Sequence, residues 1–536
     1  MNGSAPRAGG FSRSARGLFA KIQNLRTANY PDAPALAIRD PWPGDPSRGA
    51  RLIKNELGLM GAIRKLEAGV FANGVGASPA MRAHTHGFTW LRDLRALGTD
   101  AARTRARALV SEFMESGDLD PLANRADVSG ARIAAWLGHY DFFAASADDD
   151  FRQRLMSRLV IDARNLAAIL PAEEHDGRAF TALKGLIAAS VAMPEHAAYM
   201  ARALRFLPQD IERQLLPDGC HMERSPAAHL SALQDLTEIR ALLQSGKIEA
   251  PALLPAAIER MGLALRALRH GDGGMALFNG SREELPSLID LVLSQAGRSG
   301  RAQAGLGDSG FHRLAAGKSI LIVDAGAPAA PGFDRFAHAG TLSFEFSAGK
   351  ERLFVNCGAT VAAGPEWRDA LRATAAHSTL IIAGVSSSEI RNDGLGRRPV
   401  HVHAQHQTAG GAHWLEISHD GWSKLFGAVH HRRLYLAESG EDLRGEDFVE
   451  AEQPQPFVVR FHLHPAVTVS LQQDNEAALL RLPSGQGWRF RADGIKIVIE
   501  ESVYFGAAEP RRTEQIVLAA HQDGPQMVKW AVTKLG

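Results

Sequence analysis

A short stretch near the middle of the chain gathers side chains that can transfer protons. The stretch LLPDGCHMERSPAAHL, residues 215–230, places His221, Glu223 and His229 within nine residues. Its Asp-Gly pair predicts a turn, and its Ser-Pro pair predicts the N-cap and first position of a new helix. If residues 220–224 are extended, His221 and Glu223 lie on one face, ahead of a helix N-terminus that favours anions. Such a loop can present acid–base groups to a substrate carboxylate.

Three side chains of this stretch, Glu223, Ser225 and His229, also have ordinary structural interpretations. His229 can be a hydrogen-bonded histidine of the new helix, Glu223 a solvated acid of its first turn, and the serine only a cap. The spacing alone leaves both interpretations open.

The segments around this loop predict a helical half. From about residue 52 to 298, Ala, Leu and Arg dominate, and apolar residues recur at spacings of three and four. This pattern is typical of amphipathic helices. Many helices of similar length with short Gly, Pro and Asp connections indicate a helical toroid or bundle. We expect an irregular leader over residues 1–50 and a helical (α/α) toroid domain over 51–298.

The pattern of apolar and polar residues changes from about residue 308. Short runs of alternating apolar and polar residues follow one another, separated by Gly, Asp and Pro. This pattern predicts an antiparallel β-sandwich over residues 308–536. The expected fold class is therefore α+β multidomain, with an N-terminal (α/α) toroid followed by a C-terminal antiparallel β-sandwich. The interface of two such halves is a favoured place for a substrate cleft.

Composition and charge exclude several classes of protein. The 60 basic and 59 acidic residues give a net charge of +1, which offers no global argument for nucleic acid as a partner. No apolar run reaches the roughly 18–20 residues of a membrane-spanning helix, so we expect no membrane insertion. The two cysteines, Cys220 and Cys357, exclude a disulfide scaffold. The basic N-terminal segment lacks the continuous apolar core of a secretory signal.

Three segments, in this order, carry a resemblance to a known family. They are HGFTWLRDLRALG at 86–98, DGCHMERSPAAH at 218–229, and a run over 338–384 that begins HAGTLSFEFSAG. Across roughly residues 50–520 the chain resembles the heparinase II/III-like proteins, which join an (α/α) toroid to a β-sandwich. Many of them are polysaccharide lyases that act on uronate-containing chains. Such β-elimination needs a base for the C5 proton, an acid near the leaving oxygen, and a group that neutralises the uronate carboxylate.

The resemblance implies catalytic roles for His221, Glu223 and His377. The tyrosine that lyases of this family use is expected one helix after the His-Glu loop. That region, residues 265–281, contains no tyrosine, and its nearest titratable group is His270. Tyr435, on a predicted strand, is our candidate for the missing base or acid. Its ordinary interpretation is an aromatic residue of a sandwich strand.

The resemblance also implies a metal site with departures from the family pattern. Many members begin a strand with His-x-His-x-Asp and hold zinc with one of these histidines, a later Asp and a later His. Here those strand positions are Phe336, His338 and Gly340, the later Asp is Asn356, and the later His is His377. His338, Cys357 and His377 are therefore the candidate ligands for zinc or another divalent metal. The alternative is a hydrogen-bonded polar cluster without metal, and no organic cofactor is expected.

Other polar and aromatic residues are candidates for substrate binding. An aromatic side chain can stack on a sugar ring, an arginine can hold a carboxylate or sulfate, and an amide in a glycine-rich loop can neutralise a carboxylate. Each type also has an ordinary role in a core, a salt bridge or a turn. The candidates are Trp90, Arg92, His229, Asn279 and Arg372.

Two functions follow from these expectations, and they belong to different classes. The first is a polysaccharide lyase that cleaves a uronic-acid-containing glycan, such as a glycosaminoglycan or alginate, by β-elimination. The second is a non-catalytic glycan-binding or envelope-polysaccharide assembly protein on a lyase scaffold, which the missing tyrosine, Phe336 and Gly340 favour. A hydrolase is a weaker third option. The expected partner is an acidic polysaccharide or oligosaccharide, and a homodimer stays open. The family predicts the cell envelope or periplasm, while the lack of an export signal leaves the cytoplasm open.

Overall fold

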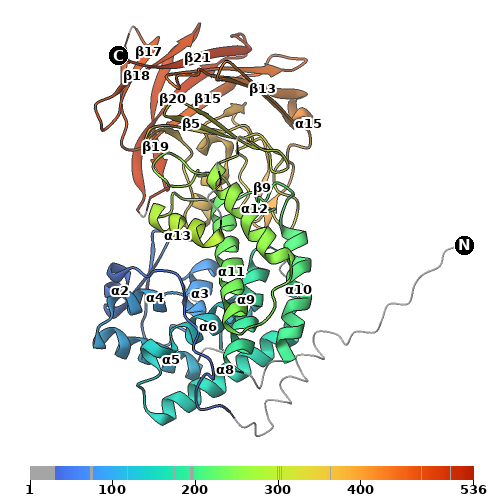
Figure 1. Ribbon diagram of the computed structural model, residues 1–536. Coiled ribbons are helices and arrows are strands. Elements are labelled where there is room, and N and C mark those ends of the chain that lie inside the picture. Colours follow the sequence, from blue (N-terminus) through green and yellow to red (C-terminus); the bar gives the residue numbers. More distant parts are fainter. Residues whose placement is uncertain are drawn as a thin grey trace, which may run out of the picture. The chain divides into compact units, whose positions relative to one another are not determined.

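A computed structural model describes residues 30–72, 76–116, 119–172, 176–193, 198–297, 300, 302–303, 305–361, 364–472, 474–507 and 509–536. These residues form two compact units (Figure 1). The first comprises the described part of Met1–Gly58 together with Ile63–Asp210 and Glu238–Leu254. The second comprises Leu59–Ala62, Ile211–Thr237 and Pro255–Gly536. The loop at 215–225 and every long strand therefore belong to the second unit.

Helices build the first unit, as the apolar spacing predicts. Several begin at a capping side chain: Asp148 accepts a hydrogen bond from the Phe151 amide at the start of α8. Helices α6 and α9 pack closely because Gly130 and Gly185 face each other. A Cβ atom on Gly185 would lie 2.3 Å from the Gly130 Cα atom. The helices before the sandwich are α2 (Pro46–Ile53), α3 (Pro79–Gly87), α4 (Leu91–Leu97), α5 (Asp100–Ser116), α6 (Ala126–Gly138), α7 (Tyr140–Phe143), α8 (Asp149–Ile169), α9 (Arg178–Ala192), α10 (Ala198–Gln214), α11 (Pro226–Ser245), α12 (Leu253–Ala267) and α13 (Pro286–Ala296), with short strands β1 (Glu56–Leu59) and β2 (Ala62–Lys65) and the 3-10 helix η2 (Pro121–Asn124).

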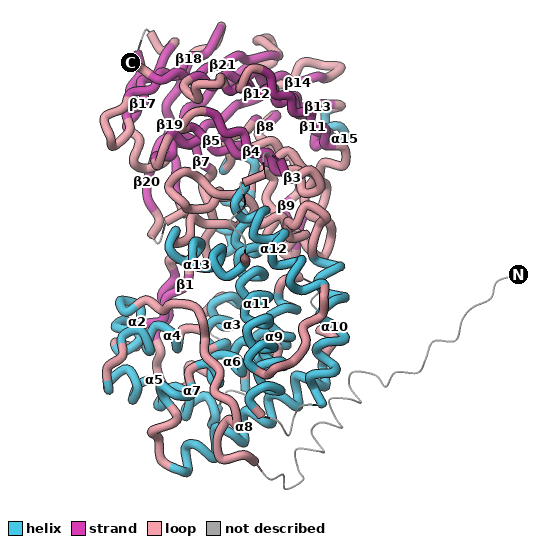
Figure 2. Tube along the Cα trace, viewed as in Figure 1, coloured by secondary structure: helices cyan, strands magenta, loops and turns pink. Residues whose placement is uncertain are grey.

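Two antiparallel sheets dominate the second unit (Figure 2). In the described part of the chain, the eight-stranded sheet has the order β11-β12-β13-β14-β21-β18-β17-β16. The nine-stranded sheet has the order β19-β20-β15-β7-β6-β5-β4-β3, with β8 paired to β15. The elements are β3 (Gly305–Leu306), β4 (Phe311–Ala316), β5 (Ser319–Asp324), β6 (Phe344–Ala348), β7 (Glu351–Val355), α14 (Gly364–Arg372), η4 (Thr374–Ala376), β8 (Leu380–Ile382), β9 (Ile390–Arg391), β10 (Gly394–Leu395), β11 (Val402–Ala409), β12 (Ala412–Trp422), α15 (Ser423–Phe426), β13 (Ala428–Leu436), β14 (Asp442–Glu450), β15 (Phe457–Leu463), β16 (Thr468–Gln472), β17 (Ala477–Arg481), β18 (Gly487–Asp493), β19 (Ile497–Tyr504), β20 (Arg511–Ala520) and β21 (Met527–Lys534).

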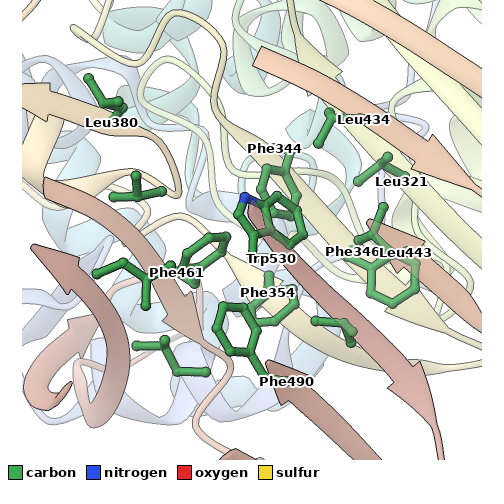
Figure 3. Packing of buried hydrophobic residues seen from close by; sticks show 14 of the residues in the cluster. Leu321, Phe344, Phe346, Phe354, Leu380, Leu434, Leu443, Phe461, Phe490 and Trp530 are labelled. Atoms are coloured by element: carbon green, nitrogen blue, oxygen red, sulfur yellow. The ribbon is translucent and has the colours of Figure 1, made fainter. Parts of the chain in front are cut away.

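An aromatic core fills the space between the two sheets (Figure 3). Phe344 of the nine-stranded sheet stacks on Trp530 of the eight-stranded sheet, with 5.6 Å between ring centroids. Phe461 meets Trp530 edge-on at 4.9 Å. Side chains that alternate along each strand supply this core, because successive residues of a strand point to opposite faces. The expected fold class, a helical toroid followed by an antiparallel β-sandwich, is confirmed.

A buried ion pair lies within the sandwich. Arg432 and Asp447 are both fully buried, 2.7 Å apart, and Asp447 also accepts hydrogen bonds from His430 and Trp530. Burial alone raises the pKa of Asp447, but Arg432 and His430 outweigh it and hold that pKa below its usual range. These bonds join strands β13, β14 and β21 through one carboxylate.

Two further observations bear on the sequence expectations. Helix α2 begins at Pro46, inside the segment expected to be irregular, because Asp45 caps it by accepting from the Ser47 amide. Among the described residues, no helix is both long and apolar enough to cross a membrane.

Candidate functional site

The loop at 215–225 is a tight hairpin that ends in a helix. Gly219 has a φ of +85°, and a Cβ atom there would lie 2.5 Å from the Arg260 carbonyl oxygen, so only glycine fits the turn. Pro226 begins helix α11, and the Ser225 hydroxyl caps it by accepting from the Ala228 amide. The predicted turn, cap and helix start are therefore confirmed. The expectation that residues 220–224 are extended is wrong, because the Arg224 amide bonds the His221 carbonyl at 2.9 Å in a second turn and Arg224 has a φ of +51°.

The predicted acid–base groups of this loop are buried and hydrogen-bonded. His221 is fully buried; its Nε2–H donates to the Gln214 side-chain oxygen at 3.0 Å, and its Nδ1 accepts from the Glu223 amide at 3.3 Å. The Glu223 carboxylate lies 4.0 Å from the same Nδ1 atom. His229 accepts from the His221 amide at 3.2 Å and donates to the Met261 carbonyl at 2.9 Å. Both ring nitrogens of His229 are thus hydrogen-bonded to the backbone. Burial lowers the pKa of His229 to about 4.

Asn279 connects this loop to the segment that carries His338. The Asn279 side chain donates to the Arg224 carbonyl at 2.8 Å and accepts from the His338 amide at 3.0 Å. Its backbone is left-handed, with a φ of +47°, a conformation that asparagine tolerates better than most residues. The Asn279 amide therefore joins the backbone of the 215–225 loop, at Arg224, to the backbone of the segment that carries His338.

His338 and His377 are hydrogen-bonded directly to each other. Their Nδ1 and Nε2 atoms are 3.0 Å apart, and His377 Nδ1 donates to the Ala373 carbonyl at 2.8 Å. His377 Nε2 is therefore the acceptor, and His338 supplies the proton of the shared bond. Burial lowers the pKa of His377 to about 4 and, with the neighbouring His377, holds that of His338 well below 6.5. The pair is neutral near pH 7.

The residues present do not complete a zinc site around this pair. Cys357 Sγ lies 3.5 Å from His462 Nδ1 and 3.9 Å from the Ser502 hydroxyl, and burial raises the pKa of its thiol to about 12. The Asn356 side chain donates to Glu345 and accepts from the Ser378 amide. Among the described residues, no group of three His, Cys, Asp or Glu side chains is arranged to hold a metal. Metal binding by His338, Cys357 and His377 stays a prediction.

Arg372 and Tyr435, two other predicted residues of this unit, have different surroundings. The Arg372 guanidinium is buried and donates to the carbonyls of Ala337, Arg391 and Gly394, and burial lowers its pKa to about 10. Tyr435 lies on β13 of the eight-stranded sheet, 5.1 Å from Trp414 between ring centroids. The structure does not bring Tyr435 together with the histidine pair.

Trp90 and Arg92 belong to the first unit. Trp90 is about 1% exposed; its indole donates to the Thr85 carbonyl and its ring packs against Phe88 at 4.8 Å. Arg92 forms an ion pair with Asp40 at 2.9 Å. Both side chains hold the helical unit together, and their role in substrate binding stays a prediction.

A polar network around Glu345 was not foreseen. Glu345 is fully buried, and its carboxylate accepts from His270 Nε2 at 3.0 Å and from the amides of Leu277 and Asn356. His270, noted only as the nearest titratable group, also accepts from the Ser347 hydroxyl. Glu345 was missed because it interrupts an apolar strand, FEF, at a single position. The network joins the glycine-rich loop at 270–281 to strands β6 and β7.

A second unforeseen cluster contains a tyrosine. The Tyr504 hydroxyl donates to Glu283, which also lies 3.4 Å from His464 Nε2. Tyr504 is fully buried, and burial together with Glu283 raises its pKa well above 10, although Arg352 acts in the opposite direction. The only signal in the sequence was the His-x-His pattern at 462–464. A buried, protonated tyrosine suits a structural hydrogen bond better than contact with a substrate.

The chain is similar to known proteins along most of its length. Residues 124–293 match the family model of the heparinase II/III N-terminus, and residues 298–531 match that of the heparinase II/III-like C-terminal domain. The FtsZ-localized protein C of Caulobacter vibrioides (strain NA1000 / CB15N) is 33% identical over 534 residues, which cover 94% of this chain and 91% of that protein.

Two solved structures share the fold at low sequence identity. A crystal structure of heparinase III matches with a TM-score of 0.73 at 12% identity, covering 98% of this chain and 89% of that one. The heparan sulfate lyase HepC of Pedobacter heparinus, solved as a mutant, matches with a TM-score of 0.62 at 15% identity, covering 97% and 88%. Both support the toroid and sandwich architecture.

Proposed function

Since the chain belongs to the heparinase II/III-like family, we propose that it keeps the lyase scaffold without lyase chemistry. In this proposal it is a glycan-binding protein of envelope assembly that localises with FtsZ. The observation that carries the proposal is that the groups which β-elimination needs are bonded to one another and to the backbone.

The group expected to neutralise a uronate carboxylate is the first part of this observation. Lowering the pKa of the C5 proton requires a donor aimed at the carboxylate of the substrate. The Asn279 amide instead donates to the Arg224 carbonyl, and its oxygen accepts from the His338 amide. Turning this amide toward a substrate breaks two buried hydrogen bonds, each of which costs about 1–3 kcal/mol when its partner is left unpaired.

The proton-transfer groups are the second part. His338 donates a hydrogen bond to His377, and His377 donates one to the Ala373 carbonyl. The tyrosines of the second unit have other partners. The Tyr435 ring packs against Trp414, and the Tyr504 hydroxyl donates to Glu283. A lyase of the family type needs a tyrosine beside the histidine, and this unit supplies none in contact with the pair among the described residues.

The partner in the proposal comes from the relative that matches across the whole chain. That protein is named for its localisation with FtsZ, and the two chains align over 94% of this one. A shared localisation is therefore a direct expectation for the present chain. The glycan-binding part rests on the scaffold and on the surface described in the next subsection.

One observation favours the second candidate, an active lyase. Asn279 bonds both the 215–225 loop, at the Arg224 carbonyl, and the His338 amide next to the His338–His377 pair, which supports the composite site that β-elimination would use. Under this candidate, binding of the glycan would rearrange these hydrogen bonds. The lyase candidate predicts an unsaturated uronate product, and the non-lyase proposal predicts none.

Co-sedimentation with FtsZ tests the proposed localisation. Purified full-length chain is mixed with polymerised FtsZ from the same source and centrifuged, and a fluorescent fusion is imaged beside labelled FtsZ in cells. Heparinase III, which shares the fold, serves as the matched control. The proposal expects the chain, and not heparinase III, to pellet and co-localise with FtsZ. Equal behaviour of the two proteins in both assays overturns it.

A further inference from the structure

The face of the eight-stranded sheet that points away from the core carries a hollow of about 660 Å³. Its side chains come from five neighbouring strands, β12, β13, β14, β21 and β18, which are labelled together in Figure 2. These strands lie in the interior of the sheet, because β11 and β16 form its two edges. The hollow belongs entirely to the second unit and is separate from the histidine pair and the Asn279 loop.

One row of side chains across these strands supplies the aromatic surface of the hollow, called the platform below, and its deepest part, called the floor. The strand register places Trp414 opposite Tyr435, Tyr435 opposite Arg444, Arg444 opposite Ala531, and Ala531 opposite Arg491. Trp414 is 40% exposed although it is large and apolar. Ala531 is small between two arginines, so the floor of the hollow lies there. The row contains two aromatic rings and two cations, and no acid.

The neighbouring row pairs opposite charges and, with three acids and two bases, has a net charge of −1. It runs Glu416, Arg433, Glu446, Lys529 and Asp493, with the signs alternating from strand to strand. Arg433 lies 3.0 Å from Glu446 and 3.6 Å from Glu416, and Lys529 lies 3.7 Å from Glu446. Opposite charges on facing strands stabilise a sheet. This row therefore forms one wall of the hollow and contributes little net charge.

Of the three remaining cations of the hollow, Arg489 and Arg491 are left for a ligand. Arg444 is paired with Asp442 at 2.6 Å and lies over the Tyr435 ring. Arg489 and Arg491 form no ion pair with any residue that the structure describes. Two unpaired guanidinium groups beside an aromatic platform favour a ligand that carries carboxylate or sulfate groups and has a flat apolar face.

We propose that this hollow binds an acidic oligosaccharide, with a sugar ring on Trp414 and Tyr435 and its acidic groups on Arg489 and Arg491. Tyr435 and Arg491 are three strand spacings apart, roughly 14 Å, which exceeds one sugar ring and calls for an oligomer. The wall of paired charges supplies acceptors as well as donors for hydroxyl groups. A peptide that adds a strand needs an open sheet edge, and the hollow has none. This inference rests on the glycan-binding part of the proposed function and adds its location.

Isothermal titration of the full chain with hexasaccharides of heparan sulfate and hyaluronan tests the inference. Cellohexaose is the neutral probe, and a hexamer of glutamate is the acidic peptide probe. The variants are Trp414→Ala, Arg491→Ala and Trp414→Phe. The matched controls are Trp367→Ala, an exposed tryptophan on α14, and Arg481→Ala, an exposed arginine on β17. Circular dichroism and thermal melting establish that each variant folds.

The expected result is binding of at least one acidic hexasaccharide, weakened about tenfold or more by Trp414→Ala and by Arg491→Ala. Trp414→Phe retains most of the affinity, both controls keep it, and added salt reduces it. Acidic saccharide binding that is unchanged in the two alanine variants overturns the location and leaves the proposed function standing. No binding of either acidic saccharide overturns both. Equal affinity for the glutamate hexamer or for cellohexaose overturns the ligand class.

Discussion

Replacement of Asn279 distinguishes a structural clamp from a catalytic side chain. In the structure its amide bonds the Arg224 carbonyl and the His338 amide, and its backbone is left-handed. If Asn279 clamps these two loops, Asn279→Ala destabilises the folded protein. If Asn279 serves chiefly to neutralise a substrate carboxylate, the same change removes activity and costs little stability.

The size of the effect follows from three contributions. Asn279→Ala leaves two buried backbone groups unpaired, at about 1–3 kcal/mol each, and forces alanine into a left-handed conformation that costs roughly 1 kcal/mol. We expect a total loss of about 3–7 kcal/mol in the free energy of unfolding. Asn279→Gly removes the same two bonds without the backbone strain, so we expect it to be less destabilised by about 1 kcal/mol.

Urea unfolding followed by tryptophan fluorescence measures the loss, and hydrogen exchange with mass spectrometry locates it. Exchange is expected to rise at residues 222–226 and 336–340, where the two bonds end. A loss below about 1 kcal/mol, the size of one ordinary hydrogen bond, with unchanged exchange in both segments would refute the clamp.

Three further predictions concern buried titratable groups. The pKa of His377 is about 4 in the folded protein and near 6.5 when unfolded, so the unfolded chain binds more protons between these values. The contribution of His377 to the free energy of unfolding is therefore complete above pH 6.5 and falls by about 1.4 kcal/mol per pH unit toward pH 4. His377→Gln is expected to flatten this slope, which urea titrations at a series of pH values measure. Asp447→Asn leaves Arg432 buried without its counter-charge and costs about 3–5 kcal/mol by the same assay; a loss under 1 kcal/mol contradicts the buried pair. The thiol pKa values of Cys220 and Cys357 are both about 12, so neither reacts with Ellman's reagent at pH 8 until urea unfolds the chain; rapid native reaction would contradict their burial.

The sequence predicted local structure and the general architecture well. Apolar spacing identified the helices, alternation identified the strands, and the Asp-Gly and Ser-Pro pairs located the turn before α11. These features depend on residues close together in the chain. For His229 the spacing left a hydrogen-bonded helix histidine as one of two interpretations, whereas the burial of His221 and Glu223 was not predicted.

The polar partners within the site could not be predicted, because they join segments that are far apart in the sequence. Asn279 bonds groups 55 and 59 residues away, and Glu345 bonds His270 across 75 residues. For Tyr435, alternation gives the face of its strand but does not say which of two sheets the strand joins. The register that aligns Trp414, Tyr435 and Arg491 likewise depends on the order of the strands.

The most direct test of the central claim is the absorbance near 232 nm that an unsaturated uronate product gives. Purified full-length protein is incubated with heparan sulfate, hyaluronan, chondroitin sulfate and alginate, with and without added zinc, and heparinase III serves as the positive control on heparan sulfate. Our account predicts no rise on any of these glycans, although at least one acidic glycan is bound. A rise that is lost in His221→Ala would contradict it and establish β-elimination at the 215–225 loop.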